Sequence, residues 1–159
     1  MKPERRFVLF RADGDALTGV VVRYGDTAAF GEWRERFEPG ALSYDDVIVN
    51  LQHDRAKPVA RLGAGLMLSD SPERMEARIE PPDTSYGREA RELVTAGILR
   101  GLSMEFLARE ERMEGKTRIV SRADLVGIGI VDRPAYAESA IAARFAELSL
   151  RRAPRRVAF

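Results

Sequence analysis

Short segments of alternating apolar and polar residues, which are typical of β-strands with one buried face, recur along most of the chain. Turn-forming residues separate these segments, as at Asp13-Gly14-Asp15 and Pro81-Pro82. Many short strands joined by turns favour a mostly antiparallel barrel or sandwich that carries helices. The alternation predicts strands at residues 7–10, 16–24, 47–53, 59–62, 66–69, 75–79, 99–110, 117–121 and 125–131.

Two segments follow the helical period instead. Residues 85–96 begin after side chains that can cap a helix and end at Gly97, where a left-handed residue commonly terminates one. Residues 137–148 repeat apolar side chains at helical spacing. Trp33 and Phe37 lie four residues apart in a loop rich in aromatic and charged residues, and could share a helical face.

Length and composition indicate one globular domain. The 159 residues include 45% hydrophobic ones, and we place the domain at residues 1–150. Four arginines make residues 151–159 a basic tail, which we interpret as a solvated, flexible terminus rather than a binding arm. No stretch has the pattern of a signal peptide or of a membrane-spanning helix, so we expect a cytoplasmic protein.

Charge and cysteine content exclude several classes of function. Lys and Arg total 26 and Asp and Glu total 25, so the net charge of +1 attracts neither nucleic acid nor a membrane surface. Cysteine is absent, which excludes disulfides, thiol catalysis and cysteine-ligated zinc. The single histidine excludes a His-rich metal site, although an all-carboxylate site stays compatible with the composition. We predict no metal and no cofactor.

Ser103 and His53 are the residues with the clearest potential for catalysis. A serine needs a base to act as a nucleophile near neutral pH, and His53 is the one imidazole in the chain. Gly101 and Glu105 share a strand face with Ser103, because side chains in a strand repeat every two residues. Gly101 leaves room for a substrate segment, and Glu105 either binds a cationic substrate group or faces water. Either Ser103 or His53 alone would more often be structural.

Four blocks of the sequence resemble, in the same order, the motifs of the tailed-phage prohead (procapsid maturation) serine proteases. The resemblance extends from about Gly19 to Arg144, most of the chain. The blocks are Arg36-Phe37-Glu38-Pro39-Gly40-Ala41, Leu51-Gln52-His53-Asp54 with Lys57-Pro58-Val59-Ala60-Arg61-Leu62, Gly97 through Phe106, and Leu125 through Tyr136.

This resemblance implies a fold and a function. The family is similar in fold to the herpesvirus assembly proteases, which implies a mainly β (α+β) protein: a closed antiparallel β-barrel of about seven strands with two or more flanking helices. It also implies a serine endopeptidase that acts inside the assembling procapsid, in the cytoplasm of the bacterial host. Its substrates would be the scaffold protein or the scaffolding segment of the major capsid protein, and the protease itself. The herpesvirus relatives further imply a homodimer. The cleavage site, and whether the source is a phage, a prophage or a phage-derived particle, stay open.

Carried over to this chain, the resemblance makes Ser103 the nucleophile and His53 the general base, and by analogy with the viral proteases it places the backbone of Arg133 in the oxyanion hole. Many relatives carry a carboxylate at the position of Gly127, and glycine cannot orient an imidazole. We favour Asp132 as the third member of a Ser-His-Asp triad, with a Ser-His dyad aided by a backbone carbonyl as the alternative. The other candidate acids are Asp54, Glu105 and Asp124.

Two other functions are compatible with the same residues. Gly127 favours a catalytically inactive assembly module that binds capsid or scaffold protein without cutting it. A small ligand-binding barrel with Trp33 and Phe37 at its mouth is the third hypothesis, although we interpret these aromatic residues chiefly as packing groups. Replacement of Ser103 separates the hypotheses, because only a protease would lose its function.

Overall fold

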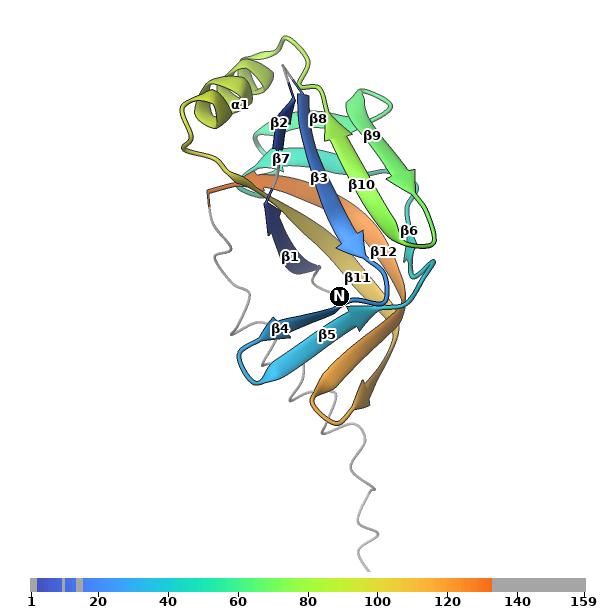
Figure 1. Ribbon diagram of the computed structural model, residues 1–159. Coiled ribbons are helices and arrows are strands. Elements are labelled where there is room, and N and C mark those ends of the chain that lie inside the picture. The colour runs from blue at the N-terminus through green and yellow to red at the C-terminus, as the bar shows by residue number, and fades with distance from the viewer. Residues whose placement is uncertain (1–2, 10, 14–15, 133–159) are drawn as a thin grey trace, which may run out of the picture.

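The computed structural model describes residues 3–9, 11–13 and 16–132, which form one strongly curled sheet with a single helix at one end (Figure 1). The fold is mainly β, as predicted from the alternating pattern. The sheet has twelve strands in this part of the chain. They are β1 (Glu4–Leu9), β2 (Arg11–Asp13), β3 (Ala16–Arg23), β4 (Thr27–Phe30), β5 (Trp33–Phe37), β6 (Leu42–Ser43), β7 (Ile48–Leu51), β8 (Pro58–Leu62), β9 (Gly65–Asp70), β10 (Arg74–Ile79), β11 (Gly101–Glu114) and β12 (Thr117–Val131).

The two longest strands, β11 and β12, form an antiparallel hairpin that runs through the whole sheet (Figure 1). On its far side β12 pairs in turn with β5, β6 and β7, all of them parallel to it. The path continues through β8, β9, β10 and β3 to β2, and β1 lies on the other side of β11. Shifts of register within the hairpin are β-bulges, which bend long strands and increase their twist. The bulges allow one hairpin to follow the curl of the sheet.

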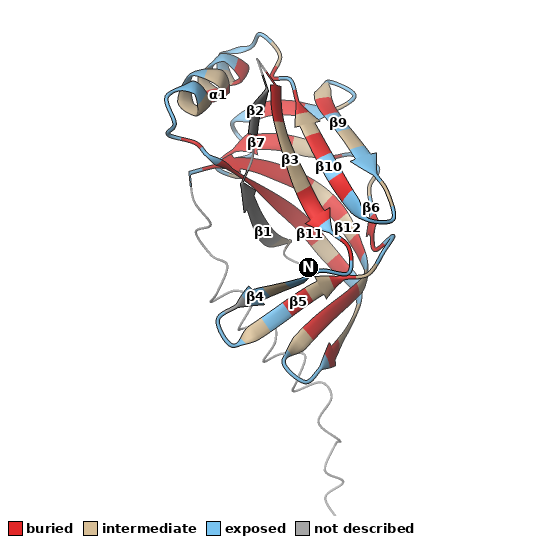
Figure 2. Ribbon diagram, viewed as in Figure 1, coloured by how far each residue is buried: buried red, intermediate tan, exposed pale blue. Residues whose placement is uncertain are grey.

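The hydrophobic core lies inside the curl, and the central strands beside it are buried along much of their length (Figure 2). Leu102, Met104 and Phe106 of β11 are each at most 2% exposed and belong to the core, as do Ile128 and Ile130 of β12. Complete burial of a side chain of this size contributes roughly 1.5–3 kcal/mol. The intervening residues of both strands therefore face away from the core, and this opposite face carries the candidate site.

Helix α1 (Ser85–Thr95) begins and ends close to the predicted residues. The Thr84 side chain caps it by accepting a hydrogen bond from the backbone N–H of Gly87 at 3.1 Å. Gly97, just after the helix, has φ +74°, the left-handed conformation expected of a terminating glycine. Ala90 is fully buried where the helix packs near β8. No helix in the described ranges has the length and apolar character needed to cross a membrane.

Several sequence-based predictions differ from the structure. The sheet is mixed rather than antiparallel, and a closed barrel of about seven strands with two helices is not confirmed, since the path ends at β1 and β2. The segment around Trp33 and Phe37, predicted to be a loop, is the hairpin β4–β5. Phe37 anchors this hairpin in the core, where it packs edge-on against Phe106 with ring centroids 5.3 Å apart. The two strands predicted at 117–121 and 125–131 are one strand. The second predicted helix and the basic tail, residues 137–148 and 151–159, lie outside the described residues.

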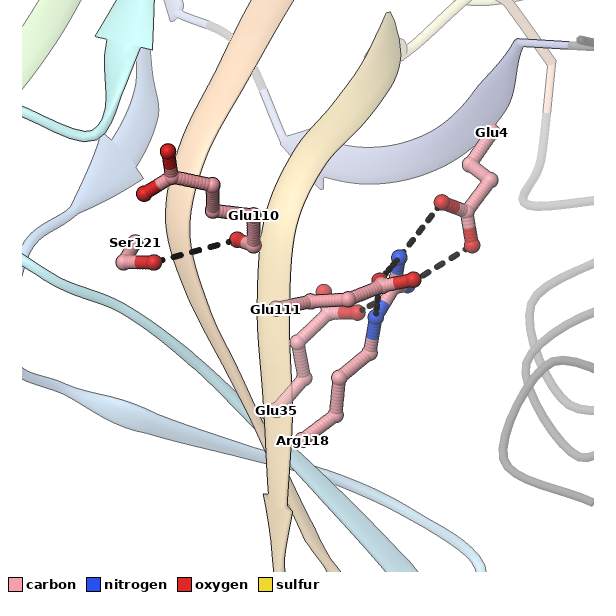
Figure 3. Close-up of polar contacts among 6 residues, drawn as sticks. All are labelled: Glu4, Glu35, Glu110, Glu111, Arg118 and Ser121. Carbon is pink, nitrogen blue, oxygen red and sulfur yellow. Dashed lines mark hydrogen bonds and ion pairs between the residues drawn. The ribbon is translucent and has the colours of Figure 1, made fainter. Parts of the chain in front are cut away.

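A buried arginine fastens β1 to the rest of the sheet. Arg118 of β12 is fully buried, and its guanidinium donates hydrogen bonds to Glu4 at 2.7 and 2.5 Å, to Glu111 at 2.8 Å and to Glu35 at 3.1 Å (Figure 3). Burial alone lowers the pKa of Arg118, but the hydrogen bond with Glu4 and the charges of the three carboxylates outweigh it and raise this pKa. The cluster joins β1, β5, β11 and β12 at one point.

Candidate active site

His53 leaves the end of β7 through a turn in which two consecutive non-glycine residues have positive φ angles. Gln52 has φ 52° and His53 has φ 57°, a conformation that costs on the order of 1–3 kcal/mol for each residue. Backbone hydrogen bonds hold the turn in place, from Asp54 N–H to the Leu51 carbonyl at 2.9 Å and from Leu51 N–H to the Lys57 carbonyl at 3.1 Å. The strand predicted to reach residue 53 therefore ends at Leu51, and the histidine is turned over the sheet.

The imidazole of His53 lies directly over Gly129 of β12. A β-carbon placed on Gly129 would be 2.6 Å from Cε1, 2.7 Å from Nε2 and 2.8 Å from Nδ1 of the ring. Non-bonded carbon atoms do not approach this closely, so only glycine at position 129 leaves room for the ring. Gly129 is thus a part of the site that the motif analysis did not identify.

Ser103 lies beside this position on the neighbouring strand. It is the register partner of Gly129 in the β11–β12 ladder, so the two residues point to the same face, away from the core. Side chains paired in this way have β-carbons about 4.5–5.5 Å apart. Because the imidazole occupies the β-carbon position of Gly129, the hydroxyl-bearing side chain of Ser103 and the ring lie one strand apart on the same face. Ser103 is 6% exposed.

Glu105 is the carboxylate that the structure places against the histidine. One of its oxygens, Oε1, contacts His53 Nδ1, and the Glu105 and His53 side chains are 12% and 7% exposed. Glu105 is the register partner of Gly127, and its carboxylate carbon is 3.8 Å from where a Gly127 β-carbon would be. The acid therefore comes from β11 and lies over Gly127 of β12, the position at which the resemblance led us to expect a carboxylate.

This arrangement favours one tautomer of the neutral ring. A carboxylate beside Nδ1 accepts a hydrogen bond from that nitrogen, which leaves Nε2 as the acceptor in the neutral ring. His53 Nε2 is buried and has no hydrogen-bond partner among the described residues. In a catalytic triad, a carboxylate in this position holds the imidazole in the tautomer and orientation that the reaction needs. A buried imidazole and carboxylate beside a serine hydroxyl are the groups that acyl transfer requires.

Comparison with known proteins assigns the family. The family model described as caudovirus prohead serine protease matches residues 5–152. The chain belongs to this family. No curated protein and no solved structure matches the chain. The match includes Ser103, His53 and Glu105, together with Gly127 and Gly129.

The other residues predicted for this prohead protease lie in different settings. Gly101 is buried, pairs with Val131 and shares the face of Ser103. Asp132, which the sequence favoured as the third catalytic residue, is exposed, and its backbone N–H donates to Gln52 Oε1 at 3.3 Å. Arg133, predicted for the oxyanion hole, lies outside the described residues.

The remaining two candidate acids of the protease have contacts of their own. Asp54 accepts a hydrogen bond from the backbone N–H of Ala56 at 2.9 Å. Asp124 binds Arg109 at 2.6 Å and Ser43 at 3.0 Å, and these hydrogen bonds, the one from Arg109 above all, hold its pKa below the usual range. Glu105 is therefore the acid that the geometry favours, while the prediction of Asp132 stays untested.

The strand that carries Ser103 has partners on both edges. β1 pairs with β11 on one side, with Phe7 opposite Ser103 in the register, and β12 pairs with it on the other side. Glu4, at the start of β1, is held by Arg118. Neither edge of β11 is therefore open for an added strand at Ser103.

No other feature in the described ranges competes for the role of active site. A hollow of about 1290 Å³ lies over β3, β9 and β10, and none of the candidate catalytic residues line it. Neither Trp33 nor Phe37 lines it, and Phe37 is completely buried in the core. In the part of the chain that the structure describes, no group of three or more His, Asp or Glu residues is placed to hold a metal ion.

Proposed function

We propose that this prohead serine protease is the endopeptidase of procapsid maturation, with Ser103 as nucleophile, His53 as general base and Glu105 as the acid that orients the imidazole. The observation that carries the proposal is the position of the His53 ring, which fills the space above Gly129 next to Ser103 and pairs with Glu105 through Nδ1. Two residues in a strained backbone conformation bring the ring there, and such strain is concentrated at functional sites.

The reaction proceeds by acyl transfer in two steps. In the first, the Ser103 hydroxyl attacks the substrate carbonyl while His53 Nε2 takes the hydroxyl proton, and the same nitrogen then protonates the leaving amine. Glu105 keeps Nδ1 protonated and stabilises the transient imidazolium. In the second step, water attacks the acyl-enzyme with His53 again as the base. Backbone N–H groups must stabilise the oxyanion in both steps, and Arg133 remains our candidate for one of them.

The substrate is a protein segment in an extended conformation that lies across the face of β11 and β12. Gly101 carries no side chain on this face, so a main chain can approach the sheet closely there, next to Ser103, while the His53 ring fills the space over Gly129. We propose the scaffold protein or the scaffolding segment of the major capsid protein as substrate, together with the protease itself. Cleavage takes place inside the assembling procapsid in the host cell.

Glu105 also affects the choice between a protease and an inactive assembly module. The inactive module was favoured by Gly127, because this residue cannot supply the acid found in many relatives. Since Glu105 places a carboxylate over Gly127 from the neighbouring strand, the glycine no longer counts against catalysis.

The experiment that tests the proposal is co-expression of the protease with the capsid and scaffold proteins of its own particle. Ser103→Ala and His53→Ala should each abolish processing to a similar degree, because members of one catalytic unit are not additive. Ser121→Ala is a matched control, since Ser121 is a half-buried strand serine whose hydroxyl donates a hydrogen bond to the Glu110 carbonyl (Figure 3). Trimming at the same site by the Ser103→Ala variant would refute the proposal, and unprocessed capsid protein with the wild-type protease would favour the inactive module.

A further inference from the structure

Asn50 is a buried polar residue on the same face of the sheet as Ser103 and His53. It lies in β7, between Val49 and Leu51 of the core, and therefore points away from the core. Its register partner on β12 is Gly129, which in turn pairs with Ser103 of β11. Ser103, Gly129 and Asn50 thus form one row across three adjacent strands, with the imidazole of His53 over its centre.

The carboxamide oxygen of Asn50 is an unsatisfied hydrogen-bond acceptor. Asn50 is 5% exposed, and its Oδ1 is buried without a hydrogen-bond partner among the described residues. Buried polar atoms nearly always have partners, and an exception calls for an explanation. A structural asparagine in this position would bind a backbone group of the turn or of a neighbouring strand. Asn50 instead presents a free acceptor to the face that carries the candidate catalytic residues.

A second buried polar atom without a hydrogen-bond partner lies on the same face of the sheet. His53 Nε2 also has no partner in the described part of the chain, and it lies 2.7 Å from the β-carbon position of Gly129. The β-carbon of Asn50 lies about 4.8 Å from that same position, because neighbouring strands are separated by this distance. One water molecule can bond two polar atoms that are up to about 5.5 Å apart. Strand spacing thus allows one small donor with two protons to lie between these two acceptors.

We propose that Asn50 Oδ1 and His53 Nε2 together hold the water molecule that hydrolyses the acyl-enzyme. This inference rests on the proposed function, since it requires an acyl group on Ser103. The water donates one proton toward Nε2 and the other to Asn50 Oδ1, which aligns its oxygen with the ester carbonyl. As the new carbon–oxygen bond forms, Nε2 takes the first proton. Nε2 then protonates Ser103 Oγ as the ester bond breaks, and the product leaves as a carboxylic acid.

The role of Asn50 is confined to the second half of the reaction. In acylation, Nε2 receives its proton from Ser103 and no water takes part, so the Asn50 carboxamide contributes nothing to that step. Removal of the carboxamide should therefore slow deacylation and leave acylation unchanged. A residue that merely supports the fold or positions the ring would alter both steps together.

The test uses the purified full chain and p-nitrophenyl acetate, with nitrophenolate release followed by stopped flow and acetylated protein by intact mass. Asn50→Ala should keep the rate of the initial burst within about 2-fold of wild type, while steady-state turnover falls at least about 10-fold and acetylated Ser103 accumulates. Ile48→Ala is the matched control, because Ile48 lies on the same strand and face two residues away, opposite Gly127. It should leave both rates unchanged.

Two further measurements make the outcome decisive. Hydroxylamine is a nucleophile that reacts with the accumulated ester directly, and its addition should restore turnover in Asn50→Ala. The melting temperature of Asn50→Ala should be equal to or above that of wild type, because the substitution removes an unpaired buried polar atom. Wild-type turnover in Asn50→Ala, or an equal loss of burst and turnover, would overturn the inference. Absence of any burst in wild type would instead count against the proposed function.

Discussion

The imidazole of His53 fills the space that a β-carbon at position 129 would need, so Gly129 and the ring fit together only because glycine has no side chain. A β-carbon built on Gly129 would lie 2.6–2.8 Å from three atoms of the ring. The relationship links β12 to a turn nearly eighty residues earlier in the chain, and it sets the ring beside Ser103, the register partner of Gly129. Gly127, two residues earlier on the same face, has no such relationship with the ring. Its β-carbon position has only ordinary van der Waals neighbours, at 3.5 and 3.8 Å.

The two glycines therefore predict opposite results for the same substitution. Gly129→Ala should displace the His53 ring and lower kcat/KM by at least about 10²-fold, with a loss of stability of roughly 1–3 kcal/mol from overpacking. Gly127→Ala should keep activity within a few-fold of wild type. Peptide cleavage assays and urea denaturation measure both effects. Equal activity in the two variants would contradict the placement of the ring over Gly129.

Glu105 should matter to catalysis more than Asp132. Glu105→Gln keeps the size of the side chain but allows the wrong tautomer of His53, a change that lowers kcat by on the order of 10⁴-fold in the best-studied triad. Asp132→Asn should alter kcat by less than about 3-fold, since its side chain is exposed. Steady-state kinetics of the two variants decide between the acids. A larger loss in Asp132→Asn would restore Asp132 as the third member.

Arg118 should be a major determinant of stability. Arg118→Ala leaves Glu4, Glu35 and Glu111 without their shared cation, and removal of one partner from a buried ionic cluster costs about 3–5 kcal/mol. Arg112 offers a control on the same hairpin, because it also binds two carboxylates but its side chain is 41% exposed. Arg112→Ala should lower the free energy of unfolding by at most about 1 kcal/mol. Equal free energies of unfolding for Arg118→Ala and Arg112→Ala, measured by chemical denaturation, would contradict this account.

Tyr24 should make the stability of the fold sensitive to alkaline pH. Its burial, followed by its hydrogen bond to Asp70 at 2.9 Å, raises the pKa of the phenol above the ordinary value of about 10. The neutral phenol therefore contributes stability that is fully present below about pH 10 and is lost as the pH rises above it. Tyr24→Phe should have a free energy of unfolding that falls less steeply above that pH, as urea titrations at several pH values can measure. The same slope in both proteins would rule out this role.

Local patterns in the sequence predicted a large part of the fold. Alternation located most of the strands within a few residues, and three candidate capping residues, Asp83, Thr84 and Ser85, together with Gly97 gave the limits of α1, with Thr84 the cap in the structure. Ser103 and His53 were chosen because a serine needs a base and the chain has one imidazole, and their catalytic pairing stays a prediction. The hairpin β4–β5 was missed because Phe37 and Glu35 are buried by distant residues, Phe106 and Arg118. No pattern in the nearby sequence indicates contacts with residues this far away in the chain.

The sequence by itself determined the class of the fold, the separation of core and outer faces along each strand, and the residue types available for acyl transfer. These follow from side-chain periodicity and from the chemistry of single residues, which act over a few positions. Only the tertiary structure decided that Glu105 meets the imidazole, that Gly129 makes room for it and that Asn50, with an unpartnered carboxamide oxygen, is the register partner of Gly129. The register of β7, β11 and β12, together with a left-handed turn at Gln52 and His53 that contains no glycine, brings these residues together. Pairing between strands far apart in the chain sets that register, and no local pattern encodes it.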